Sequence, residues 1–178
     1  WPTHVVLVHF NTPPELLEVI RKLDPRGIGL DPCSNPESFV MAKTEWSGPH
    51  YPSIDGLSQS WRGHGLVFMN PPHSMSPHNI EPWMEKAYNE FYEWTMMIRP
   101  PDKSTDQFVA LVPAKTDTAW FHEFAIEFPM RCFLQGRPKF WLDGKPMSGP
   151  GKFASMLIYA GYQKKKFRDL FGSLGWIP

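Results

Sequence analysis

Proline constrains this chain more than any other residue type. Twenty of its 178 residues are proline, which is twice the usual frequency of about 5%. Because proline fixes φ and lacks a backbone N–H, it is excluded from helix interiors and from central strands. The sequence therefore predicts many fixed loops and few long helices.

Several short apolar runs end directly at a proline or at an amide followed by prolines, a pattern typical of short buried strands. We expect strands at residues 27–31, 66–69, 107–112, 131–134, 139–141 and 153–159, and helices at residues 12–23, 82–94 and 118–127. Residues 34–64 are polar and are expected to form a long loop. Strands that alternate with helices, followed by a terminal strand pair, predict an α/β fold with a mostly parallel sheet.

Three of the expected strands end in residues that stand out. Asp31 ends the run at 27–31, and Asn70 and Pro113 follow the apolar runs at 66–69 and 107–112. Ligands of open α/β sheets bind beyond the carboxyl ends of the strands. These positions therefore predict a functional edge of the sheet.

The first expected helix begins with a capping sequence. Thr12 can cap the helix, Pro13 suits its first turn, and Glu15 completes a capping box. We therefore expect Thr12 to have a structural role at the start of the helix. Asp117 is expected to cap the helix at residues 118–127 in the same way.

The composition predicts one globular domain over residues 1–178. Hydrophobic residues make up 42% and charged residues 20%, and the formal net charge is zero. A neutral total excludes binding to nucleic acid by overall charge, so a polyanion site has to be local. Cys33 and Cys132 lack metal-ligand spacing and give no disulfide framework, so we expect reduced thiols, a cytoplasmic protein and no metal. No apolar stretch approaches a membrane span, so we expect no membrane association.

The corner Asn70-Pro71-Pro72 carries the groups needed to activate an aromatic amine. The lone pair of such an amine is delocalised into its ring, which makes the nitrogen a poor nucleophile. Hydrogen bonds from the amine to the Asn70 side-chain oxygen and to a proline carbonyl would draw both protons aside and let the nitrogen pyramidalise. Prolines suit this role because their fixed φ sets the direction of the carbonyl. The ring of His73 can stack on the base, as aromatic side chains do on flipped nucleobases.

The Asn-Pro-Pro corner resembles the catalytic motif of the amino-methylating DNA methyltransferases that use S-adenosylmethionine. The wider pattern is similar to the phage-type DNA N-6-adenine methyltransferase family. Seven pieces stand in that family's order over most of the chain: NTPPELL, LDPCSNP, DGLSQSW, FMNPPHS, PWMEKA, LVPAKTDTAWFHE and LQGRPKF. The resemblance implies adenine-specific DNA methylation in the cytoplasm of a host that carries a phage or prophage.

The resemblance also implies a fold and a cofactor site. The family has a Rossmann-like methyltransferase sheet, flanked by helices, whose last strands form an antiparallel hairpin. This agrees with the strand pair expected near residues 139 and 153. S-adenosylmethionine is the implied cofactor, and the residues implied to hold it are Thr12 and Pro13 at its methionine end, Asp31, Pro32 and Cys33 at the tip of the first strand, and Asp55 at its adenosine half.

By the same resemblance, DNA is the partner and the target base is held by Asn70, Pro71, Pro72 and His73. Methyl transfer is then a direct displacement without a covalent enzyme intermediate. The small size of the chain leaves no separate recognition domain, which predicts relaxed sequence specificity or help from a second subunit or a homodimer.

Two basic features are candidates for contact with DNA phosphates. The first is Arg137, which belongs to the family-like piece LQGRPKF, and the second is the dense run Lys164, Lys165 and Lys166. Charge runs of this kind bind phosphates in nucleic-acid-binding proteins, but they more often form solvated surfaces.

The sequence departs from the family pattern at two positions. The glycine-rich loop expected after Asp31 is replaced by Pro-Cys-Ser-Asn-Pro, and the aromatic residue after Pro72 is His73. Because an unperturbed imidazole titrates at about pH 6.5, protonation of His73 would alter its stacking on the base. We therefore predict weaker activity below about pH 6.5.

Other functions fit the same residues. The corner suits methylation of the exocyclic amine of cytosine, and methylation of a glutamine amide in a protein. A degenerate subunit that binds DNA or a catalytic partner is a non-enzymatic alternative, favoured by His73 and by the missing glycine loop. Strand termination alone is the structural explanation of the corner.

Overall fold

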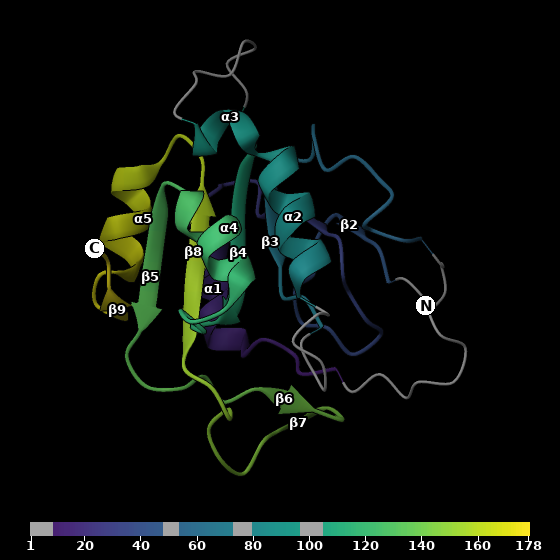
Figure 1. The fold of residues 1–178 in the computed structure, drawn as a ribbon. Coiled ribbons are helices and arrows are strands. Elements are labelled where there is room, and N and C mark those ends of the chain that lie inside the picture. The colour runs from purple at the N-terminus through teal and green to yellow at the C-terminus, as the bar shows by residue number, and fades with distance from the viewer. Residues whose placement is uncertain (1–8, 48–53, 73–79, 97–104) are drawn as a thin grey trace.

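Short strands and helices alternate along the chain, as the apolar runs predict. The computed structural model describes residues 9–47, 54–72, 80–96 and 105–178 (Figure 1). In chain order the elements are α1 (Pro14–Arg21), β1 (Ile28–Asp31), β2 (Thr44–Glu45), β3 (Leu66–Met69), α2 (Glu81–Glu90), α3 (Tyr92–Thr95), β4 (Gln107–Pro113), α4 (Ala119–Glu123), the 3-10 helix η1 (Ala125–Glu127), β5 (Met130–Leu134), β6 (Trp141–Leu142), β7 (Lys145–Pro146), β8 (Ser155–Ala160), α5 (Lys164–Phe171) and β9 (Gly175–Trp176).

A mixed sheet of order β2-β1-β3-β4-β8-β5-β9 forms the centre of the molecule. The strands from β2 to β4 pair in parallel, whereas β8 is antiparallel to both of its neighbours, β4 and β5. The prediction of an α/β fold is confirmed, and so is the parallel pairing of the strands at residues 27–31, 66–69 and 107–112. The other half of the sheet is antiparallel.

Two apolar layers cover the sheet. The central strands β3, β4 and β8 are buried along their whole length, and alternate side chains of each strand enter opposite layers. In β4, Phe108 packs with α2 and α4, whereas the next residue, Val109, packs with α1 and α5. Strands that are buried on both faces read as continuous apolar runs, which explains why they are recognisable in the sequence.

The expected pairing of residues 139–141 with residues 153–159 is wrong. Strand β8 instead inserts between β4 and β5, where both of its edges are hydrogen-bonded. Residues Trp141–Leu142 pair with Lys145–Pro146. The turn between them has φ of 52° at Asp143 and 71° at Gly144. Two successive positive φ values with the sequence Asp-Gly are typical of a tight two-residue hairpin, so β6 finds its partner locally.

The expected helix starts and lengths also need correction. Helix α1 has Pro13 as its N-cap, and neither α1 nor α4 has a side-chain cap, so Thr12 and Asp117 do not cap them. The helix expected at residues 82–94 divides into α2 and α3, and the one expected at residues 118–127 divides into α4 and η1. Strand β2, helix α5 and strand β9 are not predicted from the sequence.

Candidate active site

The carboxyl ends of β1 and β3 lie side by side at one edge of the sheet. Strand β1 ends at Asp31, and β3 ends one residue before Asn70. From β1 the chain continues to β2 on one side, and from β3 it continues to β4 on the other side. This is a topological switch point, where open α/β sheets bind their ligands. We call this end of the sheet the carboxyl edge.

The side chain of Asn70 is held at one end only. Its amide nitrogen donates to the backbone oxygen of Phe10 at 2.8 Å and to the hydroxyl oxygen of Thr12 at 3.2 Å. Its amide oxygen is buried and has no hydrogen-bond partner within the described residues. A buried polar atom without a partner costs about 1–3 kcal/mol, so this oxygen is a candidate for binding a donor group from a ligand.

The contacts of the nitrogen fix the direction of the amide. A flipped Asn70 would place its oxygen against the carbonyl oxygen of Phe10, and two acceptors would then face each other at hydrogen-bond distance. The observed orientation is therefore enforced. Of the other corner residues, Pro71 is buried and Pro72 is half-buried, whereas His73 lies outside the described residues.

Thr12 and Pro13 have local roles that differ from the capping prediction. Thr12 is 3% exposed, and its hydroxyl oxygen accepts from Asn70 instead of from the helix. Pro13 accepts the amide hydrogens of Leu16 and Leu17 on its carbonyl and so starts α1. The start of α1 therefore lies beside the corner, where the resemblance implies the methionine end of a cofactor.

Asp31 is a buried carboxyl group at the tip of β1, with 4% of its surface exposed. One of its oxygens accepts the backbone N–H of Cys33 at 3.1 Å. Burial raises the pKa of Asp31 to about 7; the hydrogen bond from Cys33 opposes this rise and the charge of Glu45 adds to it. An isolated buried carboxylate is costly unless a donor or a cation compensates it, which makes Asp31 a second candidate for ligand binding.

Cys33 links the ends of β1 and β3. Its thiol donates to the backbone oxygen of Asn70 at 3.3 Å. Burial, and then the neighbouring Asp31, raise the pKa of the Cys33 thiol well above its ordinary value. A thiol that stays protonated is a poor nucleophile, so Cys33 has a positioning role. Cys132, which is fully buried, also has a raised pKa, of about 11.

The turn that contains Asp55 packs against the tip of β1. A Cβ atom placed on Gly56 would meet the carbonyl oxygen of Pro32 at 2.0 Å, so only glycine allows this approach. The indole N–H of Trp61 donates to the carbonyl of Gly56 at 2.8 Å and holds the turn. Asp55 itself is exposed and accepts the N–H of Leu57. The structure thus brings the neighbourhood of Asp55 to that of Asp31.

Three residues of this edge were not predicted from the sequence. Asn11 pairs with Trp141 through two backbone hydrogen bonds of 2.9 Å, and its side-chain oxygen accepts from Asn35 at 2.7 Å. These contacts join the loop before α1 both to the segment after β1 and to β6. These hydrogen bonds involve mainly backbone groups, so no sequence motif predicts them.

The basic residues expected to contact DNA lie at opposite ends of the sheet. Arg137 follows β5 on the carboxyl edge, and its guanidinium donates to the backbone oxygen of Lys152 at 3.0 Å. Lys164, Lys165 and Lys166 begin α5, which follows the end of the antiparallel β8 at the opposite edge. Lys165 pairs with Asp169 at 2.6 Å.

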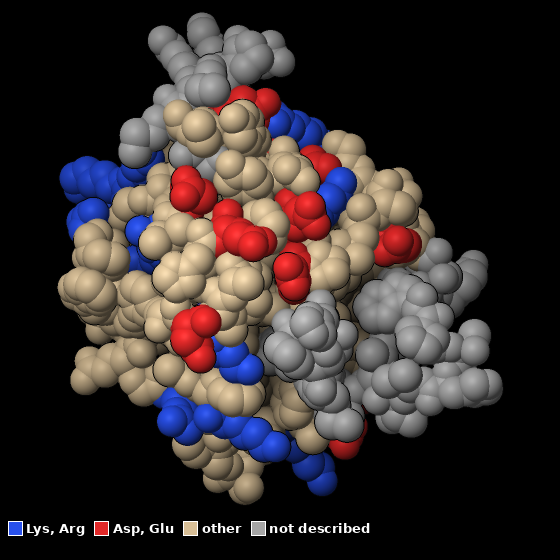
Figure 2. Space-filling model, viewed as in Figure 1, with Lys and Arg blue, Asp and Glu red and all other residues tan. Residues whose placement is uncertain are grey.

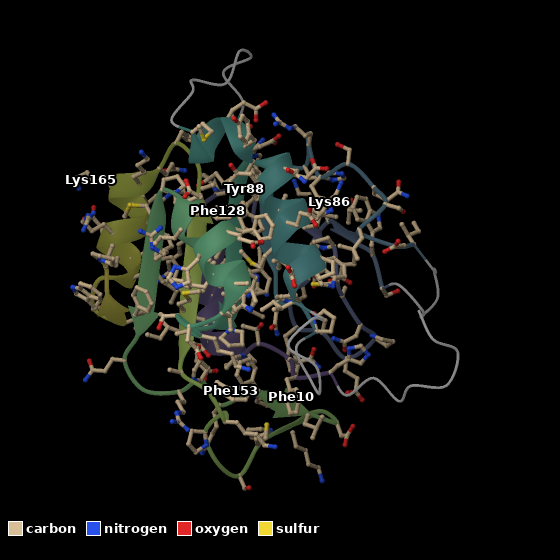
Figure 3. The ribbon with its side chains drawn as sticks, in the orientation of Figure 1. Phe10, Lys86, Tyr88, Phe128, Phe153 and Lys165 are labelled. Carbon is tan, nitrogen blue, oxygen red and sulfur yellow. The ribbon has the colours of Figure 1, made fainter. Side chains whose placement is uncertain are left out.

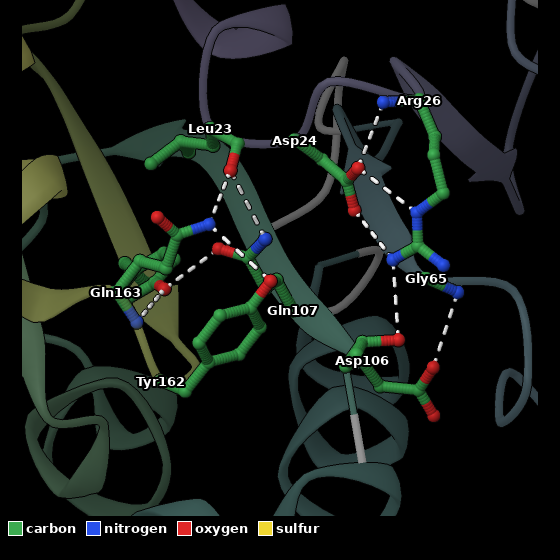
Figure 4. A network of polar contacts seen from close by, with 10 residues as sticks. Leu23, Asp24, Arg26, Gly65, Asp106, Gln107, Tyr162 and Gln163 are labelled. Atoms are coloured by element: carbon green, nitrogen blue, oxygen red, sulfur yellow. Dashed lines mark hydrogen bonds and ion pairs between the residues drawn. The ribbon is translucent and has the colours of Figure 1, made fainter.

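That opposite edge, which we call the amino edge, holds a dense polar network (Figure 4). Asp24, Arg26, Gly65, Asp106 and Gln107 take part in it. A cavity of about 230 Å³ lies beside it, lined by residues that include Lys43 and His64. This cavity is at the far end of the strands from Asn70, so we do not assign it to the chemistry of the corner.

Among the residues that the structure describes, no cluster of His, Cys, Asp and Glu side chains is suited to a metal ion. Within the same ranges, no helix is both long enough and apolar enough to cross a bilayer. A comparison with protein-family models and a comparison with curated proteins each find no match to this chain.

Proposed function

We propose that this protein transfers a methyl group from S-adenosylmethionine to the exocyclic amine of adenine in DNA, within a Rossmann-like methyltransferase fold. The observation that carries the proposal is the Asn70 side chain, whose nitrogen is fixed by Phe10 and Thr12 while its buried oxygen has no partner among the described residues. An aromatic amine supplies the N–H group that this oxygen lacks.

Asn70 acts on the amine by accepting a hydrogen bond from one of its N–H groups. As that hydrogen is drawn out of the plane of the base, the nitrogen lone pair loses conjugation with the ring and becomes available for attack. The acceptor is already oriented before the base arrives, because Phe10 and Thr12 prevent the amide from flipping. Preorganised dipoles of this kind need no reorganisation during the reaction. A carbonyl of the adjoining prolines is proposed to accept the second hydrogen.

The residues at the end of β1 fit the proposed cofactor. Thr12, Pro13, Asp31, Pro32, Cys33 and Asp55 would hold it. S-adenosylmethionine, when bound, supplies an electrophilic methyl group on a positively charged sulfur. Asp31 offers a buried carboxyl group whose ionisation is disfavoured in the free protein, and ligand donors would relieve that cost. The close packing of Gly56 on Pro32 brings the Asp55 turn to the same place.

No covalent enzyme intermediate is needed for this reaction. The Cys33 thiol, which is close to Asn70, has a raised pKa and donates its hydrogen to a backbone oxygen. The chain contributes orientation and hydrogen bonding. The bond between sulfur and methyl would break as the nitrogen–carbon bond forms, so that the donor would leave as a neutral thioether and the nitrogen would lose a proton to water. Holding reacting groups in line is worth up to about 7–11 kcal/mol in ideal cases.

Methyl transfer to unmethylated DNA tests the proposal. The purified protein is incubated with DNA and methyl-labelled S-adenosylmethionine, and the DNA is digested to nucleosides and weighed. We expect methylated adenine; methylated cytosine would support the alternative substrate. No labelled nucleoside at all would contradict the proposal and would favour a degenerate subunit.

Asn70→Ala provides the residue-level test. Removing a preorganised hydrogen-bonding group of this kind lowers the rate by about 10²–10³-fold, and we expect a loss of that size. Asn35→Ala is the matched control, because it removes another hydrogen-bonded amide of the carboxyl edge, and we expect it to retain most of the activity. Equal losses in the two variants would mean that Asn70 is only structural.

A further inference from the structure

The segment of residues 135–154, which we call the basic hairpin, contains β6 and β7 and lies beyond the carboxyl edge (Figure 1). It carries four cationic side chains and one acidic one: Arg137, Lys139, Lys145 and Lys152 against Asp143. The whole chain has a net charge of zero. The hairpin thus has a local excess of positive charge, and Figure 2 shows a row of Lys and Arg side chains at this end of the molecule.

The basic hairpin is fixed to the protein. Phe140 is 6% exposed and its ring lies 6.5 Å from that of Phe10, edge to face. The backbone N–H and carbonyl of Trp141 both form hydrogen bonds with the backbone of Asn11. The Trp141 ring packs on that of Phe39, with ring centroids 5.0 Å apart. The Arg137 guanidinium ties the two ends of the hairpin together by donating to Lys152. The cations on this segment are thus presented by an ordered frame.

Three of these cations are available to a ligand. Lys139, Lys145 and Lys152 are exposed, and no acidic side chain of the described residues pairs with them. By contrast, Lys165 on α5 is paired with Asp169. A fourth cation, Lys115, comes from the loop after β4 and lies 4.1 Å above the ring of Phe153, which is itself 44% exposed.

The basic hairpin is connected to the corner on two sides. Asn11, which pairs with Trp141, directly precedes Thr12, the residue that accepts from Asn70. At its other end, the carbonyl of Ala154 accepts the N–H of Ala114, one residue beyond β4. Phe10 and Phe153 both lie at this end of the molecule (Figure 3). A polymer bound along the hairpin would therefore pass beside the site.

We propose that the basic hairpin binds the phosphodiester backbone of DNA next to the target nucleotide. The proposal rests on the proposed function, and it identifies the surface that holds the substrate of that site. Phosphates bind clusters of unpaired Lys and Arg, and exposed aromatic rings such as Phe153 can stack on unpaired bases. A neutral protein that acts on a polyanion needs its cations close to the reacting group, which is where this hairpin places them.

Two triple variants with the same change of charge test the proposal. One is Lys139→Gln, Lys145→Gln and Lys152→Gln, on the hairpin. The other is Lys164→Gln, Lys165→Gln and Lys166→Gln, on α5. Arg137 is left intact in both because it holds the hairpin together. The affinity for fluorescent DNA is measured by anisotropy over a range of salt concentrations, with duplex and single-stranded oligonucleotides in separate arms.

We expect the hairpin variant to bind DNA at least tenfold more weakly than the wild type at low salt. Each phosphate contact contributes about 0.9 to the slope of log affinity against log salt for duplex and about 0.7 for single strands. The slope should therefore become shallower by about 2–3 for the hairpin variant. The slope of the α5 variant should match that of the wild type. The KM for DNA should rise in the hairpin variant, whereas the KM for S-adenosylmethionine should not.

The outcomes separate this proposal from the proposed function. If the wild type methylates DNA but the hairpin variant keeps its affinity and salt slope, the hairpin proposal is wrong and the function stands. If the hairpin variant loses DNA binding but the wild type transfers no methyl group, the surface is correct and the activity is wrong. A weakened α5 variant beside an unchanged hairpin variant, or a wild type that does not bind DNA, overturns the hairpin proposal.

Discussion

Two buried aspartates, one at each edge of the sheet, differ in what surrounds them. Asp24 on the amino edge is 2% exposed, and its two carboxylate oxygens accept from the backbone N–H and the guanidinium of Arg26. This partner lowers the pKa of Asp24. Asp31 on the carboxyl edge is buried to a similar degree, but no cation faces it among the described contacts, and burial raises its pKa to about 7.

The same contrast separates two amide side chains, those of Gln107 and Asn70. Gln107 on the amino edge is fully buried, and both halves of its amide are used, since it donates to the carbonyl of Leu23 and accepts from the hydroxyl of Tyr159. Asn70 on the carboxyl edge uses only its nitrogen. Polar groups with complete partners stabilise the fold, whereas incompletely partnered ones in an otherwise well-paired protein indicate where a ligand completes them.

The largest expected effect concerns Asp31. A pKa of about 7, against an ordinary value of 3.8, corresponds to at most about 4 kcal/mol. Between pH 3.8 and about pH 7 the folded state keeps the Asp31 proton that the unfolded state releases. The stability that the protonated carboxyl group contributes is therefore lost as the pH rises through 7. Asp31→Asn, which keeps the acceptor for Cys33, should therefore stabilise the protein at pH 8 by up to this amount. Chemical denaturation at pH 5 and pH 8 measures it.

Asp31→Asn should also weaken cofactor binding. If S-adenosylmethionine binds the ionised carboxylate, its affinity for the wild type should fall as the pH drops below 7. Calorimetry should then show that the wild type releases a proton when the cofactor binds, whereas the variant releases none. A variant that is less stable than the wild type at pH 8 would show that Asp31 has a structural partner and would remove the contrast with Asp24.

Gln107→Ala, in contrast to Asp31→Asn, should lower the stability of the protein and leave its function intact. The substitution leaves the Tyr159 hydroxyl without its acceptor and creates a cavity in the core, so we expect a loss of about 3 kcal/mol in the free energy of unfolding. The turnover number should be unchanged, because the amino edge is remote from Asn70. Urea unfolding and methyl-transfer kinetics measure the two quantities. A large fall in kcat at intact stability would break the distinction between the edges.

Thr12→Val tests how the Asn70 amide is oriented. The substitution keeps the shape of the side chain but removes the oxygen that accepts from Asn70, while the bond to Phe10 remains. We expect kcat to fall about tenfold, which corresponds to about 1.4 kcal/mol, and stability to change by less than about 1 kcal/mol because Thr12 does not cap α1. Thr12→Ser should restore activity. A destabilisation typical of a lost cap, with kcat unchanged, would refute the orienting role.

The smallest expected effect concerns His73, which lies outside the described residues. Protonation below about pH 6.5 should weaken its stacking on the base, so kcat of the wild type should decline a few-fold at acid pH. His73→Phe should remove this decline in kcat, while the pH dependence of cofactor affinity that Asp31 causes remains. A flat profile of kcat between pH 5.5 and 8 in the wild type would contradict the assignment.

The part of the fold that the sequence predicts is the part built from continuous apolar runs. Strands β1, β3, β4 and β8 are buried on both faces, and prolines or polar residues mark their ends. Strand β2 consists of Thr44 and Glu45, which are too few to carry a periodic signal, and it pairs with the outer edge of β1. In α5, Phe167 and Phe171 are spaced for one helix face, but these two residues after three lysines are too few to indicate an amphipathic helix.

The site divides in the same way. Asp31 and Asn70 are predictable because polar residues at the ends of buried strands converge on one edge. The partners of these two residues are not predictable. Asn70 is held by the backbone carbonyl of Phe10, and the tip of β1 is held by the close packing of Gly56 on the carbonyl of Pro32. Backbone groups are identical in every residue, so sequence cannot identify them as partners. The predicted capping box at Thr12 is wrong because α1 begins at the backbone carbonyl of Pro13, which leaves the Thr12 hydroxyl to accept from Asn70.

The position of β8 has a consequence for how the chain is made. This strand completes the sheet between β4 and β5, yet it is synthesised after both of them. A nascent chain that has not yet reached Ser155 presents two bare strand edges, and such edges invite pairing with other chains. We expect ribosome-bound intermediates of this length to aggregate or to recruit chaperones until six late residues close the gap.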